Sequence, residues 1–118
     1  MAFVQSLGGT EQVIIAGSFS HDVGTVRGTG FSVAVSSGVF TITLDRAYNG
    51  LISCTATVMN ATSATGESLI AALKSHSVAD GTTGGTIVIE TIDDTGNIES
   101  TPTSVIEVHF CAVLDVDT

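Results

Sequence analysis

The sequence has few of the residues on which nucleic-acid-binding and membrane-surface proteins depend. Among 118 residues there is no tryptophan, one proline, two cysteines and only three lysine or arginine residues. Twelve acidic residues give a net charge of −9. Three cations are too few to neutralise a run of phosphates, and we therefore expect no nucleic-acid partner. An anionic membrane surface is disfavoured for the same reason.

Long apolar runs are also missing. No run approaches the roughly 20 apolar residues that cross a bilayer. The first ten residues, MAFVQSLGGT, have neither the positive charge nor the continuous apolar stretch of a secretory signal. We therefore expect no membrane partner and no export by the secretory route.

The composition is nevertheless strongly apolar. Hydrophobic residues make up 43% of the chain, charged residues 13%, and the mean hydropathy is +0.48. A chain of this length forms one domain with its own core, and so small a domain should expose more charge than this. We expect the spare apolar residues to cover an interface with another subunit or partner. The alternative is a tight core built from small Ala, Val, Thr and Ser side chains.

Alternating patterns and regularly spaced turn residues predict strands along most of the chain. Gly38 marks a short hairpin connection in VSSGVF. Only GESLIAALKSHSV has a spacing compatible with a helix, through Leu69, Ile70 and Leu73; we favour a strand, with a short helix as the alternative. About eight strands are expected, near residues 11–19, 22–27, 30–36, 38–45, 50–60, 67–78, 85–92 and 104–115.

The strand patterns define the fold class and the domain organisation. Residues 38–45 have one wholly apolar face, as in a half-buried antiparallel strand. Residues 104–115 are apolar on both faces, which predicts a central strand covered on both sides. We predict an all-β, single-domain antiparallel β-sandwich or jelly-roll-like barrel over residues 11–118. Residues 1–10, with paired glycines, are predicted to form a flexible N-terminal arm.

No pattern for a reactive site is convincing. His21, His76 and His109 lack metal-ligand spacing, and there is no Gly-x-Ser-x-Gly motif. The segment EVHFC places Glu107, His109 and Cys111 on one face of one strand. Those three residues could supply three metal ligands, or a thiolate with a base. We favour a structural interpretation, in which a neighbouring acid holds the histidine in a packed interface. We therefore assign no catalytic, cofactor-binding or metal residue, and expect neither enzyme activity nor a cofactor.

The two cysteines each lie inside an apolar strand. Cys54 in LISCTATV and Cys111 in VHFCAVL are interpreted as small buried hydrophobic residues. A disulfide between them is the alternative, and it requires adjacent strands.

Three segments together resemble a known class of proteins. They are GTGFSVAVSSGVFTITLDRAYNGLISCTATV, GGTIVIETIDDTGN and EVHFCAVL. Their order of strands and turns resembles the small β-sandwich structural proteins of tailed bacteriophages, of the head decoration or cement type. Similar modules occur at the ends of trimeric phage fibres and, more remotely, in trimeric jelly rolls of the complement and tumour-necrosis-factor type. The resemblance covers Gly28 to Leu114, and no functional residue is transferred by it.

The resemblance implies a function by assembly. It implies a homotrimer that binds the major capsid protein lattice on the outer surface of a phage head, stabilises it, and is located in the virion after synthesis in the host cytoplasm. The alternative is a trimeric fibre or receptor-binding, carbohydrate-binding module, although Tyr48 and five phenylalanines offer few aromatic platforms. The absence of a collagen-like stalk or heptads favours the decoration protein. A small lyase or isomerase would have to rely on His76, His109 and Glu107.

Overall fold

The computed structural model describes residues 3–7, 10–59, 69–79, 84–93, 96–98 and 107–116, and its regular elements in these ranges are all strands. In this part of the chain there is no helix long and apolar enough to cross a membrane. The strands are β1 (Phe3–Leu7), β2 (Thr10–Ser20), β3 (Val26–Arg27), β4 (Phe31–Ser36), β5 (Val39–Leu44), β6 (Gly50–Met59), β7 (Ile70–Ser77), β8 (Thr86–Ile92) and β9 (Glu107–Asp115).

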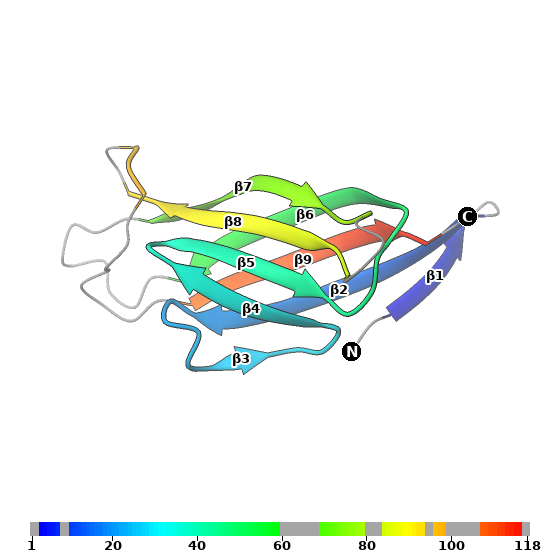
Figure 1. Cartoon of the computed structure of the whole chain (residues 1–118), viewed down its shortest axis with the longest axis horizontal. Coiled ribbons are helices and arrows are strands. Elements are labelled where there is room, and N and C mark those ends of the chain that lie inside the picture. The colour runs from blue at the N-terminus through cyan, green and yellow to red at the C-terminus, as the bar shows by residue number, and fades with distance from the viewer. Residues whose placement is uncertain are drawn as a thin grey trace.

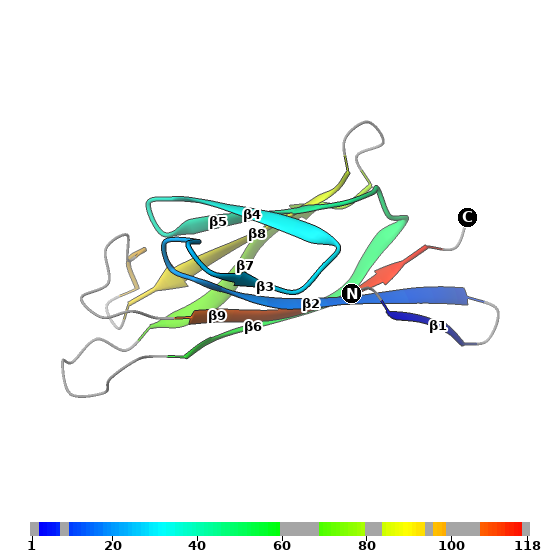
Figure 2. The ribbon, with the colours of Figure 1, turned by 90° about the horizontal axis from the view of Figure 1, so that it is seen from below.

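The strands form two antiparallel sheets that face one another (Figure 1). One sheet has the order β1-β2-β9-β6, with β3 also paired to β2, and the other has the order β4-β5-β8-β7. Seen from the side, the two sheets are separate layers, and the hairpin of β1 and β2 extends past the end of the other sheet (Figure 2). The predicted all-β antiparallel sandwich is confirmed.

The core lies between the two layers and follows the alternation of the sequence. On β5 and β8 every second side chain is buried. Phe110 on β9 packs edge-on against Phe31 across the sandwich, at 4.9 Å between ring centroids, and lies 6.3 Å from Phe19. The largest fully enclosed apolar side chains come from both sheets, namely Ile15, Phe19, Phe40, Ile42, Leu44, Ile87, Ile89, Val108 and Leu114.

Local turn chemistry explains where several strands begin and end. Ser36 pairs with Val39, so Ser37 and Gly38 alone connect β4 and β5, with φ of 52° and 79°. Positive φ at both positions is the pattern of a tight hairpin turn, which confirms the predicted connection. The segment predicted as strand or helix near 67–78 is the strand β7 in its described residues.

The prediction of a strand over residues 22–27 is mostly wrong, because only Val26–Arg27 form β3. The carboxylate of Asp22 accepts hydrogen bonds from the Ser20 hydroxyl at 2.8 Å and from the Gly24 amide at 2.9 Å. These bonds hold a turn, in which Val23 has a φ of 53°. The side-chain bonds of Asp22 replace the ladder bonds of a strand.

The N-terminal residues form part of the first sheet. Residues 3–7 are the strand β1, and its register runs from Phe3 opposite Ile14 to Leu7 opposite Thr10. The division into a flexible arm at 1–10 and a sandwich at 11–118 stays a prediction, with β1 lying in the range assigned to the arm.

The expectation for the last strand is only half correct. β9 is central, between β2 and β6, but among the described residues no second layer of the chain covers its outer face. Val108, Phe110, Ala112 and Leu114 are buried inward, whereas on the outer face 47% of the His109 side chain is exposed. Residues 104–106 lie outside the described ranges. In the part of the chain that the structure describes, the second apolar face of β9 is therefore an outer surface of the sheet.

Candidate interaction surface

The outer face of β2, β9 and β6 has a central area without acidic residues, lysine or arginine. Three successive rows of directly opposed residues cross these strands, and we call their nine members the neutral face. The rows are Ile14, Val113 and Ser53; Ala16, Cys111 and Thr55; and Ser18, His109 and Thr57. None of the twelve acids of the chain lies in these three rows.

Most residues of the neutral face are accessible, although Ser18 is buried. Ile14, Cys111 and Val113 are half-buried, whereas Ala16 and Thr55 are exposed. Its members are mostly small, so the apolar atoms of the sheet are not shielded by long side chains. The outer face of the other sheet has one charge pair, with the ammonium group of Lys74 3.9 Å from Glu90, beside two rows without charge.

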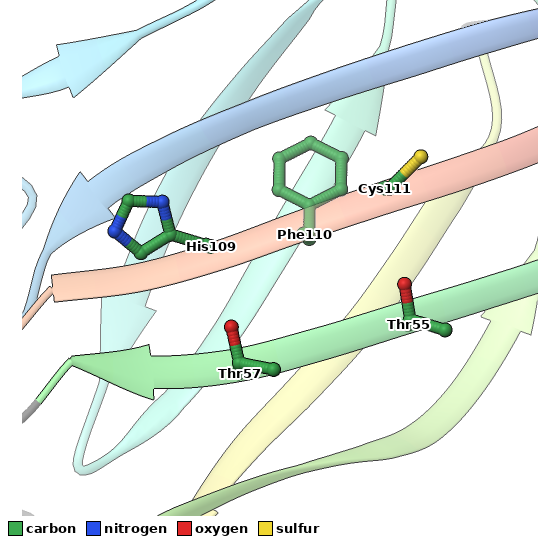
Figure 3. A pocket seen from close by; sticks show the side chains of 5 residues that line it. All are labelled: Thr55, Thr57, His109, Phe110 and Cys111. Atoms are coloured by element: carbon green, nitrogen blue, oxygen red, sulfur yellow. The ribbon is translucent and has the colours of Figure 1, made fainter.

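A shallow depression lies between β6 and β9 on this face. Figure 3 shows Thr55 and Thr57 on β6 beside His109 and Cys111 on β9. Its volume is about 170 Å³. Pockets that enclose small molecules usually have about 300–1,000 Å³. The depression therefore fits a side chain of a protein partner better than a small-molecule ligand.

Charges border the neutral face at both ends of β9. At one end, the Glu107 carboxylate lies 3.2 Å from His109 Nε2 and 3.8 Å from the guanidinium group of Arg27. At the other end, the carboxylate of Asp115 accepts a hydrogen bond of 3.5 Å from the side-chain amide of Asn49. Exposed pairs of this kind contribute at most about 1 kcal/mol each. They leave the middle of the face uncharged and its edge polar.

The structure does not bring Glu107, His109 and Cys111 together as one site. Alternate residues of a strand are about 6.7 Å apart, so the three span about 13 Å, too far to bind one ion together. His109 contacts Glu107, and Cys111 lies in the row of Ala16 and Thr55. Within the described ranges no group of three His, Cys, Asp or Glu residues is placed to hold a metal ion.

The other two histidines lie elsewhere. His76 is on β7 in the opposite sheet, in register with Ile87, and His21 is in the turn after β2. A lyase or isomerase would need His76 close to His109 and Glu107. The structure places His76 in a different sheet from the other two, so the three side chains do not form one site.

The disulfide that was the alternative for Cys54 and Cys111 is not formed, and the two residues, predicted to be buried, are half-buried. β6 and β9 are adjacent, but Cys54 is opposite buried Ala112 and Cys111 is opposite exposed Thr55. Successive side chains of a strand point to opposite faces, so one thiol points inward and the other outward. Both cysteines are free. Burial raises the pKa of the Cys54 thiol, with a smaller contribution from the nearby Cys111.

We predict that mild oxidation of the folded protein gives no intramolecular disulfide. The raised pKa of Cys54 leaves less thiolate at a given pH, which slows both oxidation and alkylation of this residue. Peptide mapping by mass spectrometry under non-reducing conditions measures this. Oxidation in urea is the control and should give the Cys54–Cys111 bond. The same bond in the folded protein would contradict the register of β6 and β9.

The residues on β2 and β6 are the part of this surface that sequence reasoning missed. A signal for them was present in the sequence, because the outward positions of both strands are uncharged. These positions are Ala16 and Ser18 in β2 and Thr55 and Thr57 in β6. Comparison of the chain with protein-family models, curated proteins and solved structures finds no match. The resemblance to phage decoration proteins therefore stays a prediction.

Proposed function

We propose that this protein is a non-catalytic structural protein that acts by binding other protein surfaces, and specifically that it is a decoration protein of a phage head. The observation that carries the proposal is the neutral face. Depletion of charge is the compositional mark of the centre of protein interfaces, and a polar border surrounds such centres. The three uncharged rows, bordered by Glu107 and Asp115, have this composition.

The neutral face is also supported by a packed core. The residues of this core, from Val13 to Leu114 in sequence order, form a single cluster. The strands of the neutral face turn their inner side chains into this core. A preformed surface loses little conformational freedom when it binds. Many copies on a symmetric lattice add avidity, so that a modest contact suffices for each one.

The specific role as a cement protein rests on the resemblance of residues 28–114. A protein that binds the assembled shell but not its dissociated subunits stabilises the shell by mass action. The proposed state is a homotrimer that contacts the major capsid protein in the virion. Such a protein requires neither turnover nor a cofactor.

Heating of phage heads tests the proposal. Heads of the phage that encodes the chain are purified without it, heated with increasing amounts of the protein, and assayed for DNA release. We expect the rupture temperature to rise until the sites are saturated. An unchanged rupture temperature at saturating protein would refute the role as a cement, as would absence of the protein from purified virions.

Immunogold labelling of virions tests the main alternative. A decoration protein is expected over the whole head. Labelling confined to tail fibres would move the proposal to a fibre or receptor-binding module. Of the five aromatic residues with described side chains, Phe31 is half-buried and the other four, Phe19, Phe40, Tyr48 and Phe110, are buried, which disfavours a carbohydrate platform built from them.

A further inference from the structure

We infer that the free edge of β1 pairs with the same strand of a second copy, in an antiparallel arrangement about a twofold axis at Gln5. This inference goes beyond the proposed function, because it concerns contact between copies and not contact with a phage head. A twofold contact joins copies in pairs. The proposed homotrimer therefore needs other surfaces, and this contact links one trimer to the next.

The register of the first hairpin determines which backbone groups of β1 are unpaired. Leu7 is directly opposite Thr10, and only two residues separate them in the sequence. The pair that closes a two-residue hairpin exchanges both N–H···O bonds, and hydrogen-bonded pairs alternate with pairs that are not. The backbone groups of Gln5 and Leu7 therefore bond to β2. Those of Val4 and Ser6 point to the opposite edge.

A hydrogen bond on the other side of β2 supports this assignment. Glu11 is opposite Ser6, and its backbone carbonyl accepts a hydrogen bond of 3.2 Å from the amide of Val116, directly after β9. The backbone of Glu11 thus faces β9 and not β1, as expected where the pair with Ser6 is not hydrogen-bonded. Because β1 ends its sheet, the described residues offer no strand that pairs with the outward groups of Val4 and Ser6.

The edge of β1 is open to a second sheet. The hairpin of β1 and β2 extends past the end of the other sheet (Figure 2). Natural edge strands are usually protected by lysine, proline or bulges. β1 has none of these, whereas β7 carries Lys74 and both β6 and β7 have a shift in register. β4 also lacks such protection, but it lies over the first sheet and does not project from the sandwich (Figure 2).

The unpaired groups of this edge are self-complementary, which selects a second copy as the partner. Val4 and Ser6 lie at equal distances on either side of Gln5. A copy rotated by half a turn about an axis through Gln5 places its Ser6 opposite Val4 and its Val4 opposite Ser6. Each of these pairs exchanges both N–H···O bonds, so every outward backbone group of the two residues is satisfied.

The pairing also keeps the charges of two acidic chains apart. Each copy has a net charge of −9, but β1 has the uncharged sequence FVQSL. No like charges therefore lie directly opposite one another, an arrangement that would destabilise a strand pair. Because the strands are antiparallel, the two sandwiches extend in opposite directions from the paired hairpins, and most of their acids lie far from the contact.

The contact is small, since each copy contributes a strand of five residues. Interfaces at the low end of the size range belong to weak and transient complexes. We therefore expect few pairs in dilute solution and more at high protein concentration. A lattice that holds copies close together raises their effective concentration, so the same weak contact is occupied there.

Cysteine cross-linking tests the inference in the full chain. The natural thiols are removed by Cys54→Ala and Cys111→Ser. Gln5→Cys or Gln12→Cys then adds one thiol to either strand of the hairpin, at two directly opposed positions. In the pair of copies, the two Gln5 positions have Cα atoms about 4.5 Å apart, which a disulfide can bridge. The two Gln12 positions lie three strand spacings apart, about 14 Å, and cannot be bridged.

The expected result is a large difference in the rate of cross-linking. At high protein concentration, mild oxidation should join Gln5→Cys chains at least about tenfold faster than Gln12→Cys chains, because thiols held together react without a diffusional search. Non-reducing gel electrophoresis measures the product of 24 kDa, or 2 × 12.0 kDa. Circular dichroism confirms that both variants are folded. Equal rates for the two variants would overturn the inference.

A substitution on the edge itself gives a second measurement. Ser6→Pro removes an outward N–H and leaves the bonds to β2 in place, whereas Ser6→Ala keeps the N–H. In the Gln5→Cys chain, Ser6→Pro should lower the rate of cross-linking to that of the Gln12→Cys chain, and Ser6→Ala should not. Slow hydrogen exchange of the Leu7 amide shows that the hairpin remains paired. Undiminished cross-linking of Ser6→Pro with a paired hairpin would contradict the inference.

Binding to heads separates this inference from the proposed function. Gln5→Cys protein that cross-links in solution but does not cosediment with heads would refute the decoration role and leave the contact between copies intact. The opposite result is no cross-linking, in solution or on heads, together with loss of head binding in Ser6→Pro. It would assign the edge of β1 to the capsid protein, overturning the inference and leaving the decoration role in place.

Discussion

Replacement of Phe110 by alanine is expected to lower the free energy of unfolding by about 3–5 kcal/mol, because it removes a buried ring and leaves a cavity. The ring is only 4% exposed, lies edge-on to Phe31 and contacts the aromatic cluster around Phe19. Its loss leaves the space between the two sheets unfilled beside Phe31. Urea unfolding followed by circular dichroism measures the change.

The control for Phe110→Ala is the adjacent residue on the opposite face. The side chain of His109 is 47% exposed, and its main contact is the carboxylate of Glu107. His109→Ala is expected to change the free energy of unfolding by no more than about 1 kcal/mol. Equal losses for the two variants would mean that the two faces of β9 are wrongly assigned.

The strands of the core could be predicted because their signal is local. In VFTITL and TIVIETI, the alternation of side chains alone determines which face is buried, and Phe40, Ile42, Ile87 and Ile89 are indeed enclosed. The sequence signal for the two-residue connection at Ser37 and Gly38 was also local.

Features that depend on hydrogen bonds of particular side chains were harder to predict. The segment from Asp22 to Arg27 has strand-like composition, but the Asp22 carboxylate binds the Gly24 amide and holds a turn. Such side-chain hydrogen bonds compete with the backbone hydrogen bonds between paired strands. Which of the two prevails depends on the neighbouring strand, and the sequence does not identify that strand.

The neutral face could be predicted only in part, because it depends on sheet order. The pattern of β9 showed that both its faces are apolar, but its neighbours β2 and β6 come from distant parts of the chain. A shift of one residue in register would exchange the faces of β6 and bring Cys54 to the side of Cys111. The row of Ala16, Cys111 and Thr55, and the failure of the disulfide interpretation, follow from that register.

Gly85→Ala is the second substitution with a large expected effect. An added Cβ would lie 2.5 Å from the carbonyl oxygen of Val78, which accepts a hydrogen bond of 2.8 Å from the amide of Tyr48. Gly85 itself is buried, and its carbonyl accepts a hydrogen bond from the amide of Leu44. Neither backbone segment can move without weakening one of these bonds. We expect a loss of about 3 kcal/mol or more in the free energy of unfolding, from overpacking together with a disrupted buried hydrogen bond.

Gly50→Ala separates this close approach from a general effect of removing a glycine. Gly50 begins β6, and an added Cβ there would meet no atom within 4 Å. We expect the free energy of unfolding of Gly50→Ala to stay within about 0.5 kcal/mol of wild type, as for most surface substitutions. Chemical denaturation of the two variants side by side makes the comparison. If Gly85→Ala is as stable as Gly50→Ala, then Gly85 and Val78 do not approach as closely as the structure places them.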